Sequence, residues 1–159
     1  MEITILTVGR LKEKYLVEGI KEYGKRISKY SKLSIVEVPD EKAPDNLSLK
    51  DIENVKAKEG LKLLARMKND SYVIVLAIEG KKLTSENLAK KIEDIKTYHS
   101  SKITFVIGGS NGLSKEVIDK ADYKLSFSDL TFPHQLMRLI LLEQIYRSFR
   151  ITNNEPYHK

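Results

Sequence analysis

The sequence predicts an α/β fold, with a mostly parallel sheet that has helices on both of its faces. Short apolar runs rich in β-branched residues alternate along the chain with longer stretches of helical periodicity. The short runs are apolar at nearly every position, which is typical of parallel strands covered on both sides. We expect strands at residues 3–8, 33–38, 72–78, 103–107 and, more weakly, 123–128.

A basic amphipathic helix is expected directly after the first strand, within residues 10–32. This segment contains eight Lys or Arg and three Glu, so its net charge is +5. Its apolar side chains follow the 4-3-4-3 spacing of one helix face. They are Leu16, Ile20, Tyr23, Ile27 and Tyr30. The basic face is either a solvated surface or a contact for a polyanion such as nucleic acid.

The later connections also have helical periodicity, at residues 48–68, 85–97 and 114–121, and a last helix is expected at 134–150. The last helix is apolar nearly all round, so it must be buried on several sides, either within the chain or against a twin subunit. The insertion PDEKAPDN at 39–46 has two prolines and several charges, which place it on the surface. No repeat or linker is evident, so we expect a single domain at 1–159.

Composition excludes several classes of protein. The chain has 159 residues, enough for one domain with its own core. It has no cysteine, which excludes disulfides, thiolate metal sites and a cysteine nucleophile, and we expect no bound metal. The apolar runs are far shorter than the roughly 18 residues that suggest a membrane span, and MEITILTVGR lacks a signal-peptide pattern. We therefore expect a cytoplasmic protein with no membrane partner.

A glycine-rich loop, GGSNG at 108–112, lies between an expected strand and an expected helix. A P-loop would need Lys and then Ser or Thr after the glycines, where this chain has Leu113 and Ser114. A dinucleotide-binding loop would follow the first strand, where VGRLKEK has a single glycine. By itself, the loop indicates either a ligand close to the backbone or a tight turn that needs glycine.

Three strand ends come together in the predicted sheet. The third strand is closed by Glu-Gly at 79–80, the fourth by Gly-Gly at 108–109, and SFSDLTFPHQLMR at 126–138 follows the fifth. The carboxyl ends of parallel strands lie at one edge, where open α/β sheets bind ligands. The last segment mixes hydrogen-bonding and apolar side chains, which suits a flat base with a polar tail. A hydrophobic staple with an N-cap near Thr131 is the structural alternative.

Five motifs occur in order along the chain. They are LAIEGK (76–81), FVIGGSNGL (105–113), SFSDLTFPHQLMR (126–138), EQIYR (143–147) and PYHK (156–159). Together they resemble the ribosomal RNA large subunit methyltransferase H family, of the SPOUT superfamily of knotted methyltransferases, and the resemblance runs essentially end to end. It implies a SPOUT α/β-knot, with a deep trefoil knot in the C-terminal half that general packing rules would reject.

The resemblance also implies the cofactor, S-adenosyl-L-methionine, bound in a bent shape at the converging strand ends. By position, the cofactor-binding residues would be Leu76, Gly108, Phe127, Ser128, Asp129, Leu130, Thr131 and Phe132. The residue types agree with this role, because the apolar members offer a slot for adenine and glycine lets a ligand lie against the backbone. Asp129 and nearby carbonyl groups would assist the positively charged sulfonium.

The substrate that the resemblance implies is the pseudouridine at position 1915 of 23S ribosomal RNA, methylated at N3 on the assembled ribosome by a homodimer. The rate of methyl transfer would come from the positioning of N3 against the methyl group and from a general base that removes the N3 proton. The catalytic candidates are His134, Tyr157 and His158. The alternative for His134 is a purely structural role. The alternative for Tyr157 and His158 is that they belong to a frayed C-terminus. The RNA-binding candidates are Arg10, Arg138 and Lys159, with an acidic partner as the equal alternative for Arg138.

Without the resemblance, the residues leave two other functions open. One is a nucleotide-binding α/β enzyme with flavodoxin-like topology, which the sheet pattern permits. The other is a non-enzymatic protein that binds ribosomal RNA through its basic helix. Binding of S-adenosyl-L-methionine, of FMN or ATP, or of none of these ligands would distinguish the three.

Overall fold

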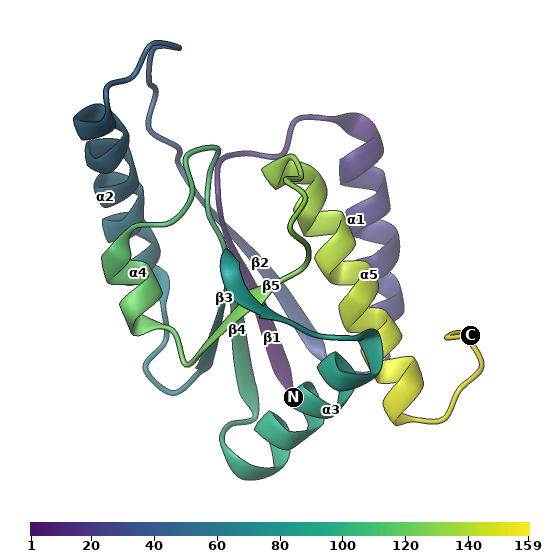
Figure 1. Ribbon diagram of the computed structural model, residues 1–159. Coiled ribbons are helices and arrows are strands. Elements are labelled where there is room, and N and C mark those ends of the chain that lie inside the picture. Colours follow the sequence, from purple (N-terminus) through teal and green to yellow (C-terminus); the bar gives the residue numbers. More distant parts are fainter.

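A five-stranded sheet forms the centre of the molecule, which the computed structural model describes over residues 1–159 (Figure 1). The strand order is β2-β1-β4-β3-β5, and every neighbouring pair is parallel. The strands are β1 (Glu2–Val8), β2 (Lys32–Val38), β3 (Tyr72–Lys82), β4 (Lys102–Ile107) and β5 (Tyr123–Ser126). The predicted α/β class with a parallel sheet is confirmed.

Five helices cover both faces of the sheet. They are α1 (Lys14–Ile27), α2 (Leu49–Arg66), α3 (Ser85–Tyr98), α4 (Lys115–Lys120) and α5 (His134–Thr152). One face carries α1, α3 and α5, while α2 and α4 pack together on the other (Figure 1). Each face has its own apolar core, and β4 supplies both, since Phe105 faces the larger core and Val106 the smaller.

Hydroxyl side chains fix where three of the helices begin. Ser48, Thr84 and Ser114 each accept a hydrogen bond from the backbone N–H three residues further on. The cap at Ser114 starts α4 directly after the glycine loop. α5 instead follows Pro133, whose restricted backbone suits the start of a helix.

The third strand is longer than the sequence predicts, because β3 ends at Lys82 rather than at residue 78. The strand bulges after Leu76, and Lys81 then pairs with the same β5 residue as Leu76 does. Gly80 allows this close passage, since a Cβ there would lie 2.7 Å from the backbone of Lys124. We call residues 79–82 the β3 extension.

The basic helix is shorter than the predicted segment 10–32. Gly9 has a φ of 88° and turns the chain after β1, so residues 9–13 form a loop and α1 begins at Lys14. The predicted buried face is present, with Leu16, Ile20 and Ile27 in the core. The exposed face carries the lysines, as the charge pattern predicts.

The last helix is buried on one side and only partly covered on the other. Leu141, Leu142 and Ile145 are fully buried in the larger core. Leu136 and Ile140 are half-buried. One chain alone therefore does not cover the whole apolar surface of α5, and burial against a twin subunit stays a prediction. None of the helices combines the length and apolar character needed to cross a membrane.

Candidate active site

A cavity of about 680 Å³ opens at the C-terminal edge of the sheet, among the ends of β3, β4 and β5. Its walls come from residues 76–78, from residues 107–113 including the glycine loop, and from residues 125–134 without residue 129, together with Met137. Half of these residues are apolar, and a volume between about 300 and 1,000 Å³ is typical of small-molecule sites. The three strand ends thus meet at one hollow, as the sequence predicts.

Seven of the eight predicted cofactor residues line this cavity. They are Leu76, Gly108, Phe127, Ser128, Leu130, Thr131 and Phe132. Asp129 does not line it. The Asp129 carboxylate is exposed and forms an ion pair with Lys82 of the β3 extension. The geometry therefore does not support a place for Asp129 beside the sulfonium, because Asp129 is absent from the lining of the cavity.

The glycine loop between β4 and α4 closes on itself. The N–H of Gly112 donates to the carbonyl of Gly109 at 3.0 Å, and Gly112 has a φ of 87°. Gly108 lies against the returning chain, since a Cβ there would come within 2.9 Å of the Gly112 carbonyl carbon. The loop is thus a tight turn that needs glycine, and its backbone faces a cavity, while contact with a ligand stays a prediction.

The segment after β5, residues 127–133, is held by short-range hydrogen bonds. Ser128 Oγ accepts from the N–H of Leu130 at 3.0 Å, and Ser126 Oγ donates to the carbonyl of Ser128 at 3.3 Å. Phe127 packs against the larger core, whereas Leu130 is 71% exposed at the rim. The segment therefore has a fixed base and an apolar rim that a ligand can cover.

His134 lines the cavity from the first turn of α5. Its burial lowers the pKa of the imidazole, and the positive charge of Arg138 lowers the pKa further, against a smaller opposing effect of Asp40. His134 is therefore neutral at neutral pH, with a lone pair that can accept a proton. Of the three catalytic candidates, only His134 reaches the cavity.

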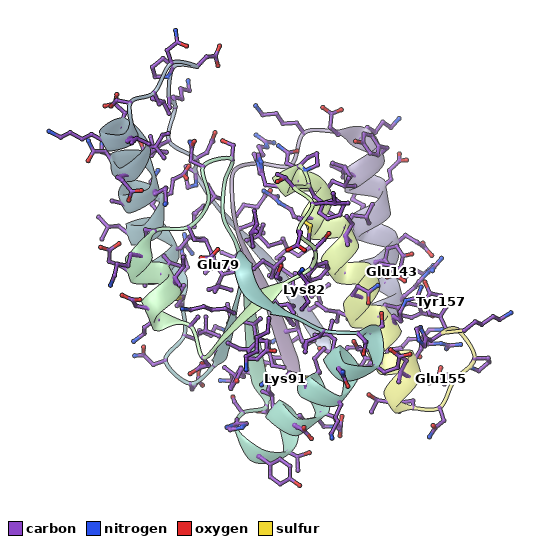
Figure 2. All side chains as sticks on the ribbon, in the orientation of Figure 1. Glu79, Lys82, Lys91, Glu143, Glu155 and Tyr157 are labelled. Atoms are coloured by element: carbon purple, nitrogen blue, oxygen red, sulfur yellow. The ribbon has the colours of Figure 1, made fainter.

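Of the other two candidates, Tyr157 lies beside the middle of α5, away from the β3 extension (Figure 2), and His158 contacts Arg147 of the same helix. Tyr157 donates its hydroxyl proton to Glu143 at 3.1 Å, and its burial, together with neighbouring hydrogen bonds, raises the pKa of the phenol to about 12. His158 lies between Arg147, at 3.0 Å, and Glu86, at 2.7 Å. The C-terminal tail is thus ordered by packing rather than frayed, but it does not reach its own chain's cavity.

The predicted RNA-binding residues differ in exposure. Arg10 and Lys159 are exposed. Arg138 is only 2% exposed, and it donates to Glu37 and to the carbonyls of Val8 and Gly9. A phosphate cannot reach Arg138 in this structure, so the prediction of an RNA contact gives way to its alternative, an acidic partner.

Two residues near the cavity are not among those predicted from the sequence. Met137 lines it from α5, and its helical spacing from His134 is a signal that points to it. Glu59 of α2 is 4% exposed and lies against Gly109. It accepts from the N–H of Glu41 at 3.0 Å, its Oε1 has no partner, and its burial raises the pKa of the carboxyl group. Nothing in the sequence marks Glu59 as buried.

The fold and the site define a class of protein. A half-apolar cavity at the C-terminal ends of parallel strands is a site for a nucleoside-sized ligand, and His134 supplies a proton acceptor beside it. The structure contains no group of three His, Cys, Asp or Glu side chains that could hold a metal ion. This is the arrangement of an α/β enzyme that binds a nucleoside-like cofactor without a P-loop.

The chain belongs to the SPOUT methyltransferase family. The model of this family, described as a predicted SPOUT methyltransferase, matches residues 1–158. The protein is therefore a methyltransferase, and S-adenosyl-L-methionine is its methyl donor, as expected from the sequence. The family also implies the knot in the C-terminal half. The flavodoxin-like and non-enzymatic alternatives do not hold.

Relatives match this chain over its whole length. Two proteins named ribosomal RNA large subunit methyltransferase H, from Clostridioides difficile strain 630 and Shouchella clausii, are 61% and 63% identical over 159 residues, which is 100% of each chain. A putative protein of that name from Methanococcus maripaludis is 60% identical over the same length. A solved structure of a probable methylase family protein from Haemophilus influenzae Rd KW20 has a TM-score of 0.55 and 15% identity, covering 99% of this chain and 70% of that chain, and supports the fold alone.

Proposed function

We propose that this protein methylates N3 of a pseudouridine in the ribosomal RNA of the large subunit, at position 1915 of 23S ribosomal RNA. The names of its full-length relatives support ribosomal RNA as the substrate. The observation that carries the proposal is the cavity, because Leu76, Gly108 and the segment after β5 meet there although they lie far apart in the sequence. The protein acts on the assembled ribosome, and so in the cytoplasm.

The residues of the cavity fit S-adenosyl-L-methionine. Leu76, Leu130 and Phe132 provide apolar surface for adenine, and Gly108 brings the backbone close to the ribose and the methionine tail. Because Asp129 is absent from the lining, main-chain carbonyl groups of the lining residues are the candidates for contact with the sulfonium. The cofactor supplies an activated methyl group, and the chain's part is to fix its orientation and to exclude water.

His134 is the proton acceptor in this proposal. As the bond between N3 and the methyl carbon forms and the sulfonium–methyl bond breaks, the proton of N3 passes to the neutral imidazole of His134. Tyr157 cannot take this role near neutral pH, because a phenol with a pKa of about 12 stays protonated. It can donate a hydrogen bond to the flipped base instead, and His158 can stack on that base.

The tail of a twin subunit completes the site. Tyr157 and His158 do not reach their own cavity, and α5 has apolar surface that one chain leaves partly uncovered. A two-fold dimer places the same surfaces of both chains against each other, so each chain's tail can serve the partner's cavity. The basic surface of α1 and the exposed Lys159 are then present twice along the RNA.

Methyl transfer to ribosomes from cells that lack this protein tests the proposal. We expect the purified protein with S-adenosyl-L-methionine to add one methyl group to the pseudouridine at 1915, located by mass spectrometry of nuclease fragments. Naked ribosomal RNA is the comparison substrate, and it should react far more slowly. A methyl group on another nucleotide, or none on either substrate, would contradict the proposal.

The pH profile tests the role of His134. Because the pKa of His134 is lowered, its basic form persists below the ordinary histidine value of about 6.5, so kcat should decline only below that pH. His134→Gln should lower kcat by about 10²- to 10⁴-fold, remove this acidic limb and leave cofactor affinity within about threefold. His99→Gln, a change outside the cavity lining, is the matched control and should behave as the wild type. A normal kcat in His134→Gln would show that another group takes the proton.

A further inference from the structure

We propose that Arg10 and Lys12 bind phosphate groups of the RNA substrate, and that the buried Arg138 is a positioning residue for the loop that carries them. The loop comprises residues 9–13, which join β1 to α1 at the C-terminal edge of the sheet, and we call it the 9–13 loop. The inference rests on the proposed action on ribosomal RNA and names the surface by which that RNA is held.

The cations of the 9–13 loop have no partner within the chain. Arg10 and Lys12 are exposed, and only their backbone groups take part in hydrogen bonds. Neither side chain forms an ion pair, whereas Lys62, Lys102 and Lys115 on other surfaces each pair with a carboxylate. An unpaired cation gives up no internal contact when it binds a phosphate, so these two are available to RNA.

Side chains from distant parts of the chain hold the backbone of this loop. Arg138 Nη2 donates to the carbonyls of Val8, at 3.0 Å, and Gly9, at 2.7 Å. Glu37 of β2 accepts from Arg138 Nη1 at 2.5 Å and from the N–H of Leu11 at 2.8 Å. The Arg138–Glu37 ion pair thus binds three backbone groups, the carbonyls of Val8 and Gly9 and the N–H of Leu11, where the chain leaves β1.

Gln135 makes two further contacts to the loop. Its Nε2 donates to the carbonyl of Arg10 at 3.3 Å, and its Oε1 accepts from the N–H of Lys12 at 3.4 Å. Gln135 follows His134, which lines the cavity, and Arg138 is one turn further along α5. The first two turns of α5 therefore contact both the cavity and the backbone of the 9–13 loop, so RNA held by the loop is held relative to the proton acceptor.

The stability of the packing between elements does not by itself explain why residue 138 is an arginine. Arg138 is 2% exposed and permanently charged, and its Nε has no hydrogen-bond partner. Its partner Glu37 is 37% exposed, and burying a guanidinium carries a desolvation cost that an apolar side chain at this position would not have. What the guanidinium adds is directed donors, which fix the carbonyls of Val8 and Gly9 in one geometry.

The acidic residues near the loop limit where a polyanion can bind. Glu13 ends the loop, and Asp40 lies near Gly9, since a Cβ on Gly9 would be 3.9 Å from the Cβ of Asp40. These carboxylates repel phosphate at both flanks. Binding therefore depends on where Arg10 and Lys12 are placed rather than on a broad positive field, which is why a positioning residue has an effect.

A set of variants separates contact from positioning. Arg10→Ala/Lys12→Ala removes the cations, and Lys68→Ala/Lys120→Ala removes two exposed lysines at the opposite edge of the sheet as a matched control. Arg138→Met removes the tether and keeps an apolar stem. Gln135→Ala removes the other side-chain contacts to the backbone of the 9–13 loop. Because Gln135 is half-buried, this variant should fold even if Arg138→Met does not. Each is measured for cofactor binding, for kcat and KM on ribosomes, and for ribosome binding at several salt concentrations.

The expected result is a change in RNA binding without a change in cofactor binding. Arg10→Ala/Lys12→Ala should raise KM at least about tenfold, keep kcat within about twofold, and lower the slope of log K against log salt by about 1.4 to 1.8, for two phosphates. Arg138→Met and Gln135→Ala should also raise KM. When Arg10→Ala/Lys12→Ala is combined with Arg138→Met or with Gln135→Ala, it should raise KM by a clearly smaller factor than it does in the wild type. Such non-additivity is expected of coupled residues.

Two outcomes would overturn the inference. If Arg10→Ala/Lys12→Ala matches the Lys68→Ala/Lys120→Ala control in KM and salt slope, the loop does not bind phosphate. If the effects of the loop and tether variants add without coupling, Arg138 is not a positioning residue. Inactivity of the wild type on ribosomes would refute the proposed function instead, and the salt dependence of ribosome binding would still decide on the loop.

Discussion

Gly108→Val should abolish binding of S-adenosyl-L-methionine while the protein stays folded. A Cβ at this position would meet the Gly112 carbonyl carbon at 2.9 Å and its oxygen at 3.0 Å, so the glycine loop has to move. The displaced loop and the added methyl groups both occupy the wall of the cavity. We expect cofactor affinity to fall at least about a hundredfold in calorimetric titrations, and stability to fall by only about 1–3 kcal/mol in thermal unfolding.

The control for this change is Gly24→Ala. A Cβ on Gly24, in α1, would lie 3.7 Å from Leu33, which is an ordinary contact. Ala in place of Gly inside a helix stabilises by about 0.5–1 kcal/mol, so this variant should bind cofactor normally and unfold at a slightly higher temperature. Normal cofactor binding by Gly108→Val would place the site elsewhere.

Loss of the tail should abolish methyl transfer and leave cofactor binding intact. Tyr157→Ala/His158→Ala removes both side chains that the proposal assigns to the flipped base, and neither lines the cavity of its own chain. We expect kcat on ribosomes to fall at least about a hundredfold, with calorimetric affinity for S-adenosyl-L-methionine within about threefold of the wild type.

Mixed dimers then reveal which subunit supplies the tail. A dimer of one Gly108→Val chain and one Tyr157→Ala/His158→Ala chain contains one complete site if the tail serves the partner's cavity. With random pairing, about half of the dimers are mixed and about a quarter of all sites are complete, so activity should return to about a quarter of the wild-type value. A mixture that is no more active than its two components, with mixed dimers verified by mass, would place the tail in its own chain's site or exclude the dimer.

The sheet follows from the sequence because its strands are buried on both faces. The runs ITILTV and ITFVI are apolar at nearly every position, and the structure has β1 and β4 within one residue of these ranges. The cavity follows for the same reason, since parallel strands bring their carboxyl ends to one edge. Seven of the eight predicted cofactor residues line that cavity, although their contact with the cofactor stays a prediction.

What the sequence does not predict depends on pairs of residues far apart along the chain. An arginine on a helix is normally exposed, and Arg138 is buried only because the fold brings it to the end of β1 and to Glu37, 101 residues away. Asp129 lies in a segment that suits a cofactor, but the extension of β3 brings Lys82 to it from 47 residues away. No local pattern contains either partner, so charge and periodicity cannot anticipate these contacts.

A crystal structure of the protein with S-adenosyl-L-methionine tests the central claim most directly. We expect density for the whole cofactor, in a bent conformation, within the hollow at the ends of β3, β4 and β5. Its adenine should lie between Leu76 and the segment after β5, and its tail should lie against Gly108. Density for the cofactor at any other surface, with this hollow empty, would contradict the account.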